Sequence, residues 1–170
     1  MKAKLRPRTA MPELPEADFR LEDFLPYRLS VAANRVSRLF ARRYADAYGL
    51  TIPEWRVLAM VGRFGTLSPS AVGEWTAMDK VKVSRAAASL AARGLLKQSQ
   101  DPEDGRGRLL RLTPKGTRVH QGVVPLACEL EGQLAAGLNR SEWAGLLKAL
   151  DKLNAHVQSV EGPEQAVTVD

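Results

Sequence analysis

The chain has 170 residues, a length that suits one compact domain or one domain extended by long helices. Hydrophobic residues make up 45% of it, enough for a core, and no apolar run reaches the length of a membrane span, which excludes a transmembrane protein. The first residues lack the apolar stretch of a secretory signal and Cys128 is the single cysteine, so we expect a cytoplasmic protein without an internal disulfide.

The net charge of +6 is concentrated in one part of the sequence. Between Thr76 and His120 there are ten basic and four acidic side chains, whereas the rest of the chain carries 15 of each. A basic segment of this kind is typical of a surface that meets phosphates, although a solvated basic face has the same composition. The elements around the segment distinguish the two interpretations.

The first part of the chain contains an arm and two candidate helices. Residues 1–22 include three prolines and show no periodic pattern, which predicts a flexible arm. Apolar residues then recur at helical spacing over 24–48, and Gly49 ends this helix. A second helix is expected over 51–64, with Trp55 on its buried face.

Two further helices follow, joined by a tight turn. Ser68 is the predicted N-cap of a short helix that runs through Trp75. Asp79 is the predicted N-cap of the next helix, which Gly94 ends. Three successive helices, the last two joined by such a turn, are typical of a helix-turn-helix.

After Gly94 the pattern changes from helical to β. Residues 95–100 and 108–113 predict the strands of a hairpin, whose polar loop is long enough to project as a wing. The sequence therefore predicts a mainly α fold with a small β-hairpin wing. Residues 50–112 would form a winged helix-turn-helix DNA-binding domain.

Two more helices are expected before the C-terminus. Thr113 is the predicted N-cap of a helix that continues to about Leu138. Ser141 is the predicted N-cap of the last helix, over 141–157, and the polar tail 159–170 is expected to be flexible.

The helix that begins at Asp79 has a basic outer face. At 100° per residue, Lys82, Arg85, Ser89 and Arg93 fall within an arc of roughly 80°, opposite the apolar side chains. The DNA major groove admits one helix, whose first turns read the bases, and a narrow wing tip with an arginine suits the minor groove. The candidate DNA contacts are Ser68, Ser70, Lys80, Val81, Lys82, Ser84, Arg85, Ser89, Arg106 and Arg108.

The segment "LSPSAVGEWTAMDKVKVSRAAASLAARGLLKQSQDPEDGRGRLLRLTPKG" resembles the winged helix-turn-helix of the MarR family of bacterial transcriptional regulators. The matching motifs are D-K-x-x-V-S-R at 79–85, R-G-L at 93–95, D-P-x-D-x-R at 101–106 and L-T-x-x-G at 112–116. Val81 and Lys82 stand where many members carry small hydroxyl residues, which predicts a different operator. Gly105 replaces a frequent arginine of the wing.

The resemblance implies a homodimer. Its outer helices, within 23–48 and 113–158, would intertwine, and each winged domain would meet one half of a roughly palindromic operator in double-stranded DNA. Two half-sites about one helical turn apart, 10–10.5 base pairs, are expected. The apolar residues that fit such an interface, or alternatively an intramolecular core, are Leu138, Trp143, Leu146, Leu147, Leu150 and Leu153.

The resemblance also implies a repressor that a small molecule releases from DNA. The expected effector is an aromatic carboxylate or phenolic compound, or an aromatic acyl-CoA thioester, and aromatic-compound catabolism is a candidate process. The candidate ligand contacts are Tyr27, Arg28, Ser30, Asn34, Arg35, Arg38, Trp55 and His120. Arginine would pair with a carboxylate or phosphate. A core position for Trp55 and a solvated His120 are the alternative interpretations.

No catalytic or metal-binding spacing occurs in the sequence, so neither an enzyme nor a metal or cofactor site is expected. Cys128 is expected to be a buried small side chain. A redox-responsive regulator that uses Cys128, or a DNA-binding or architectural protein that responds to no ligand, is the alternative function.

Overall fold

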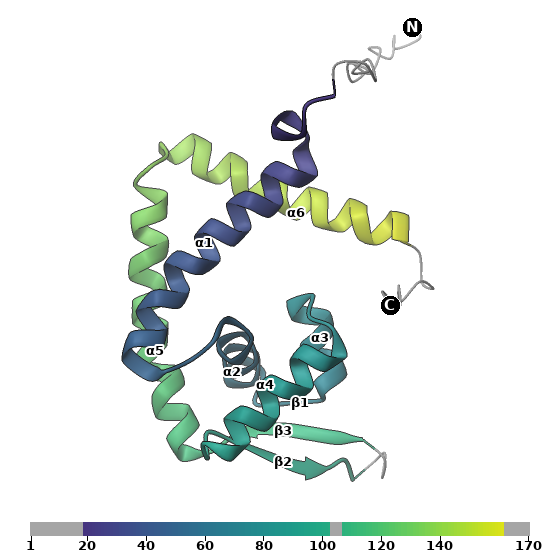
Figure 1. Cartoon of the computed structure of the whole chain (residues 1–170), viewed down its shortest axis with the longest axis vertical. Coiled ribbons are helices and arrows are strands. Elements are labelled where there is room, and N and C mark those ends of the chain that lie inside the picture. The colour runs from purple at the N-terminus through teal and green to yellow at the C-terminus, as the bar shows by residue number, and fades with distance from the viewer. Residues whose placement is uncertain (1–18, 103–106, 162–170) are drawn as a thin grey trace, which may run out of the picture.

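The computed structural model describes residues 19–102 and 107–161. The predicted arm up to residue 18, the candidate contact Arg106 and the tail from residue 162 lie outside these residues. The described chain is mainly helical, with a small antiparallel sheet at one end of the molecule (Figure 1). This confirms the predicted fold class. Among the described helices, none is both long and apolar enough to cross a membrane.

Three long helices form one part of the molecule. α1 (Leu25–Tyr48) follows a single 3-10 turn, η2 (Leu21–Asp23). It ends at Gly49, whose φ of +61° is the left-handed conformation that glycine adopts without strain. α5 (Pro114–Ala135) packs against α1, and α6 (Arg140–Glu161) leads back across the molecule (Figure 1).

The first turn of α6 differs from its prediction. The sequence predicts Ser141 as the N-cap, but the cap is Asn139. Its side-chain oxygen accepts hydrogen bonds from the backbone N–H groups of Ser141 and Glu142 at 2.9 and 3.0 Å. The Glu142 carboxylate in turn accepts from the Asn139 N–H at 2.8 Å. This reciprocal capping box satisfies three donors at once, which a cap at Ser141 would not do.

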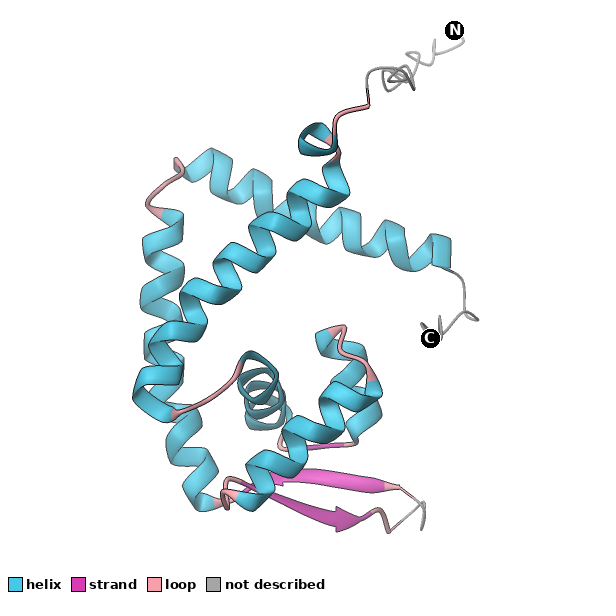
Figure 2. Cartoon of the chain, viewed as in Figure 1, coloured by secondary structure: helices cyan, strands magenta, loops and turns pink. Residues whose placement is uncertain are grey.

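The winged part contains three shorter helices and the sheet, shown by type in Figure 2. Side chains of Thr51, Ser68 and Asp79 cap the three helices. The helices are α2 (Ile52–Phe64), α3 (Pro69–Thr76) and α4 (Lys80–Ala92). The strands, in the spatial order β1-β3-β2, are β1 (Thr66–Leu67), β3 (Arg108–Leu112) and β2 (Leu96–Gln100).

The hairpin of β2 and β3 confirms the predicted wing strands, in which Leu96 pairs with Leu112 and Gln100 with Arg108. The sequence does not predict β1, because two residues are too few to show an alternating pattern. β1 pairs with the other edge of β3, Thr66 opposite Arg111, and so joins the α2–α3 connection to the wing.

One hydrophobic cluster joins the winged helices to the sheet. Its fully buried members include Val57, Leu58, Val61, Val72, Val83, Leu90, Leu95 and Leu110. Burying each such side chain contributes about 1.5–3 kcal/mol. The end of α1 reaches this cluster through Tyr44, and Leu50 follows it, whereas no residue of α6 is buried in the described chain. The winged part therefore carries the core, and α6 has little within one chain to pack against.

Candidate nucleic-acid interface

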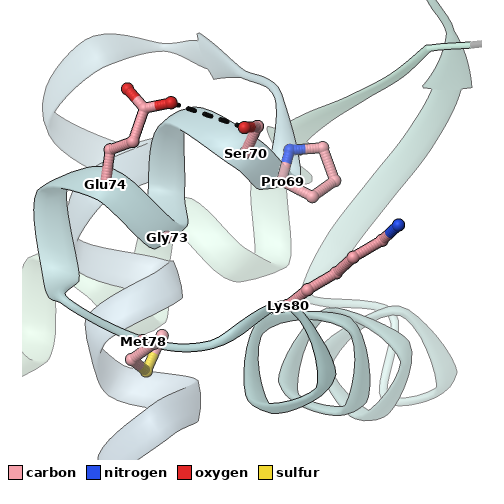
Figure 3. A pocket seen from close by; sticks show the side chains of 6 residues that line it. All are labelled: Pro69, Ser70, Gly73, Glu74, Met78 and Lys80. Carbon is pink, nitrogen blue, oxygen red and sulfur yellow. Dashed lines mark hydrogen bonds between the residues drawn. The ribbon is translucent and has the colours of Figure 1, made fainter. Parts of the chain in front are cut away.

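The turn between α3 and α4 encloses a surface hollow of about 360 Å³ (Figure 3). Ser70 lines it from α3 and Lys80 from α4, and the Ser70 hydroxyl donates to Glu74 at 3.4 Å. Ser68 does not share this exposed position. Its hydroxyl accepts from the Ala71 N–H at 3.1 Å, so Ser68 starts α3. The two candidate serines thus have different surroundings.

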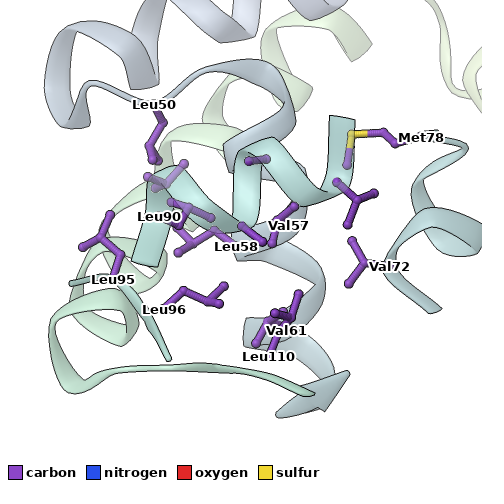
Figure 4. Packing of buried hydrophobic residues seen from close by; sticks show 14 of the residues in the cluster. Leu50, Val57, Leu58, Val61, Val72, Met78, Leu90, Leu95, Leu96 and Leu110 are labelled. Atoms are coloured by element: carbon purple, nitrogen blue, oxygen red, sulfur yellow. The ribbon is translucent and has the colours of Figure 1, made fainter. Parts of the chain in front are cut away.

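One face of α4 lies in the core. The buried residues on it are Val83, Ala86, Ala87 and Leu90. Leu90 belongs to the same cluster as Leu58 and Val61 of α2 (Figure 4). Ala91, which follows Leu90, is partly buried. The core therefore fixes which face of α4 meets solvent.

The opposite face of α4 is exposed along its first two turns. The exposed residues there are Lys80, Val81, Lys82, Ser84 and Arg85. Val81 is 57% exposed although it is apolar, so its position is not explained by the core. The structure brings these five predicted residues together on one surface.

Asp79 holds the first turn of α4 in place. Its carboxylate accepts from the Lys82 N–H at 2.7 Å and pairs with the Lys82 ammonium at 2.8 Å. These hydrogen bonds from the side chain and backbone of Lys82 hold the pKa of the Asp79 carboxyl below its ordinary value. The cap is therefore ionised at neutral pH. A DNA phosphate that binds the Lys82 ammonium would therefore compete with the Asp79 carboxylate.

Two residues of the predicted basic arc, the exposed Ser89 and the partly exposed Arg93, make hydrogen bonds within the winged part. The Ser89 hydroxyl donates to the buried Glu54 carboxylate at 2.5 Å. The Arg93 guanidinium donates to the backbone oxygens of Tyr48 and Gly49 at 2.6 and 3.0 Å. Both side chains are thus engaged within the protein. Sequence reasoning did not single out Glu54, although the spacing T-x-x-E from Thr51 is the signature of a capping box.

The wing carries arginines along β3. Arg108 is exposed at the start of the strand, and its guanidinium donates to the Gln98 side-chain oxygen of β2 at 3.2 Å. Arg111 is also exposed, and its guanidinium donates to the Thr66 hydroxyl at 3.0 Å. Sequence reasoning did not propose Arg111 as a contact. Its partner lies in β1, the strand that the sequence did not predict.

Two of the candidate ligand contacts stack on each other. The Trp55 ring lies over the His120 imidazole, with 6.1 Å between centroids and 25° between planes, and Tyr44 is the next ring, 6.0 Å from Trp55. Gly62 allows this arrangement, because a Cβ atom there would lie 2.5 Å from the His120 ring. Burial lowers the pKa of His120, so the ring is held neutral at neutral pH. His120 is half-buried, which is not the solvated position of the alternative interpretation.

The candidates on α1 divide into two groups. Tyr27, Arg28 and Arg35 line a surface hollow of about 410 Å³ near the start of the helix. The remaining candidates are exposed and do not line it: Ser30, Asn34 and Arg38. With a rise of 1.5 Å per residue, Tyr27 is about 25 Å from Tyr44 along α1. Within one chain, this hollow and the Trp55–His120 stack are therefore separate sites.

Cys128 differs from its prediction. The thiol is exposed on α5, not buried. At 100° per residue it lies about 140° around the helix from the buried Val123, so it faces away from the core. Within the described residues, no group of three or more histidine, cysteine or carboxylate side chains could hold a metal ion.

Comparisons with known proteins agree on one family. A family model described as "MarR family" matches residues 48–107. None of the curated proteins matches the chain. Among solved structures, a probable transcriptional regulator from Pseudomonas aeruginosa is 33% identical, with a TM-score of 0.69 over 79% of this chain and 99% of that chain.

The descriptions of two further structures name a small molecule or a ligand. BpsR from Bordetella bronchiseptica, described with a mechanism for regulation of its DNA binding by 6-hydroxynicotinic acid, is 31% identical, with a TM-score of 0.70 over 76% of this chain and 98% of that chain. The PcaV transcriptional regulator from Streptomyces coelicolor, in complex with its natural ligand, is 26% identical, with a TM-score of 0.66 over 87% of this chain and 100% of that chain.

Proposed function

The chain belongs to the MarR family of transcriptional regulators, and from this premise we propose that it is a homodimeric repressor that a small molecule releases from a roughly palindromic operator. The observation that carries the DNA-binding proposal is the exposed basic surface of α4, in a segment that contains the whole net positive charge of the chain. The similarity of the chain to the structure of a probable transcriptional regulator supports the same proposal.

We assign DNA binding to residues 50–112. In this proposal the first turns of α4 enter the major groove, where Lys80, Lys82 and Arg85 bond guanine edges or phosphates and Val81 touches a thymine methyl. Ser70 and Ser84 add hydrogen bonds to the sugar-phosphate backbone of the DNA. Arg106 and Arg108 of the wing reach the minor groove. Ser89 is left out of the contacts because its hydroxyl serves Glu54.

We assign dimerisation to the outer helices within 23–48 and 113–158. α6 is 22 residues long and amphipathic, yet none of its residues is buried in the described chain. Helices of this kind obtain their stability from packing an apolar face, and a second copy of the chain supplies that packing. Two winged domains then read half-sites about 10–10.5 base pairs apart.

We propose an aromatic carboxylate or phenolic effector, or an aromatic acyl-CoA thioester. The stacked rings of Trp55 and His120 offer an aromatic surface at the place where α1, α2 and α5 meet. Arg28 and Arg35 lie in the separate hollow on α1 and offer cations for a carboxylate or phosphate.

The test is fluorescence anisotropy with DNA from upstream of the gene, over a range of salt, followed by a panel of aromatic acids and their CoA thioesters. We expect specific binding that one compound abolishes. Specific binding that no compound disturbs would contradict the effector but leave the regulator. Weak binding that does not depend on sequence would contradict the operator-binding role.

A further inference from the structure

Glu54 is the single buried charged side chain of the described residues, with 5% of its surface exposed. A buried carboxylate is costly unless hydrogen bonds and a counter-charge compensate it. All the compensating groups of Glu54 come from places where helices begin or end. This position needs an explanation beyond helix capping, since an exposed glutamate caps a helix equally well.

The contacts of Glu54 join α2 to α4. One carboxylate oxygen accepts from the Thr51 N–H at 2.7 Å and from the Thr51 hydroxyl at 2.9 Å. The other accepts from Ser89 at 2.5 Å and lies 3.7 Å from the Arg93 guanidinium. Burial alone would raise the pKa of Glu54, but the hydrogen bonds from Ser89 and Thr51 and the charge of Arg93 outweigh it and lower the pKa. The carboxylate is therefore ionised at neutral pH.

Arg93 extends the link from α4 to α1. Its two hydrogen bonds, to the backbone oxygens of Tyr48 and Gly49, satisfy carbonyl groups at the C-terminus of α1, which have no partner within the helix. A cation there is also favoured by the helix dipole. The Tyr48 ring in turn lies against Gly122 of α5, where a Cβ atom would overlap the phenol oxygen. A continuous set of contacts thus runs from α5 through α1 to α4.

We propose that Glu54 and Arg93 are positioning residues that fix the direction of α4 relative to the α1–α5 pair, and so set operator affinity without touching DNA. Ser89 lies four residues from Arg85, about 6 Å along the helix, so an anchor at Ser89 and Arg93 directs the exposed first turns. The inference rests on the proposed operator binding.

The decisive variant is Glu54→Gln, because electrostatics and positioning predict opposite changes in its affinity for the specific DNA site. Glutamine keeps a hydrogen bond to Thr51 and can donate to Ser89, but it loses the attraction to Arg93. The variant is one charge more positive, so electrostatics alone would tighten binding to any DNA. Positioning instead predicts a roughly 3- to 30-fold loss of affinity for the specific site, with affinity for unrelated DNA unchanged or higher.

Asp46→Asn is the matched control, because it makes the same charge change at an exposed position near the end of α1. It should leave the ratio of specific to non-specific affinity at the wild-type value. Circular dichroism and a measurement of the oligomeric state of each variant would establish whether the fold is retained. A Glu54→Gln variant that behaves like Asp46→Asn would overturn the inference.

Arg93 provides a second, independent measurement. Arg93→Met should lower specific affinity, Arg93→Lys should recover part of it by keeping the charge, and the Glu54→Gln/Arg93→Met double variant should be no weaker than Arg93→Met alone. The salt dependence of binding should not change in Arg93→Met. A salt slope lower by about one would show that Arg93 contacts a phosphate, which contradicts a positioning role.

The two proposals fail in different ways. Wild-type protein that does not prefer its own upstream DNA would overturn the proposed function and this inference together. Wild-type preference that Glu54→Gln and Arg93→Met both retain would overturn the inference alone. Hydrogen exchange of the DNA-free protein adds a structural readout, since Arg93→Met should speed the exchange of amides at the end of α1 and the C-terminal half of α4.

Discussion

Arg85 lies on α4 and Arg93 directly follows the last residue of that helix, and the structure gives these two residues of the predicted basic arc different contacts. Arg85 is exposed on the outer face of α4, and no acidic partner within the described residues restrains it. Arg93 caps the carbonyl groups of α1 and pairs with Glu54. Spacing alone cannot separate the two, because the difference lies in which other helix end comes within reach. Arg85 is therefore the better test of DNA contact.

We expect Arg85→Ala to weaken operator binding by about 1–3 kcal/mol, because it removes a hydrogen-bond donor from the major groove. Anisotropy titrations with the operator give the affinity. Arg118→Ala is the control, since it removes the same charge from an exposed position on α5 of the basic segment. If both variants lose affinity equally, the basic segment acts through its total charge and not through α4.

His120 should make the stability of the protein depend on pH. Burial places its pKa below the ordinary value of 6.5, so below that pH the unfolded chain binds a proton more readily than the folded one. The stabilisation is therefore fully present above about pH 6.5 and is lost as the pH falls toward the pKa of the folded state. His120→Gln should show a smaller fall in Tm between about pH 8 and about pH 5.

The second histidine of the sequence, His156, is the control for this measurement. It is exposed on α6, so His156→Gln makes the same substitution without changing a buried side chain. An equal effect of the two substitutions on the pH dependence would contradict the link between burial and stability.

At the scale of elements, the connection from α4 to α5 is held by a close backbone approach. The Thr113 hydroxyl donates to the Gly94 carbonyl at 2.7 Å and accepts from the Gly116 N–H at 3.0 Å. This places Gly116 against Leu95, so that a Cβ atom at residue 116 would lie 1.9 Å from the Leu95 carbonyl oxygen. The first turn of α5 can therefore sit where it does because residue 116 has no side chain.

Gly116→Ala should consequently destabilise the protein by about 1–3 kcal/mol, even though alanine favours a helix by about 1 kcal/mol. Denaturant unfolding gives the free energy. In the same helix, a Cβ atom at residue 132 would have no neighbour within 4 Å in the described chain. Gly132→Ala should therefore be neutral or stabilising by up to about 1 kcal/mol. Equal stabilisation by both substitutions would mean that α5 can move away from Leu95 without cost.

At the scale of the whole molecule, exposed apolar side chains gather on the outer helices. Those on α1, α5 and α6 that are exposed include Leu25, Val36, Val124, Leu146, Leu147 and Val157. The winged part has fewer, with Phe64 and Trp75 in contact at 5.2 Å between ring centroids. This distribution is what a second chain on the outer helices would cover.

Leu146→Glu should convert the dimer to a monomer, because it places a charge in the apolar stripe of α6. Light scattering measures the mass, and operator affinity should fall by roughly 100-fold or more once the two half-sites no longer bind together. Ala155→Glu adds the same charge nine residues later, on the opposite face of α6, and should remain a dimer. A monomeric wild-type protein would contradict the dimer outright.

The order of the helices, most of the helix caps and the two wing strands could be predicted from the sequence alone. Periodicity and cap residues report local geometry, and local geometry suffices for a helix that begins at Asp79 or Thr113. It also identified the basic start of α4. These features depend on residues close together in the chain, such as those of the motifs at 79–85 and 112–116.

Other features depend on how parts of the chain that are distant in sequence pack together. Tertiary structure paired the two residues of β1 with β3 and left Cys128 exposed, whereas the cap at Asn139 follows from the local spacing N-x-x-E and could have been predicted from the sequence. It also joined Ser89 to Glu54 and Arg93 to the end of α1 by hydrogen bonds. The partners of Ser89, Arg93 and Thr66 are distant in sequence, and hydrogen bonding and packing across that distance fix these contacts.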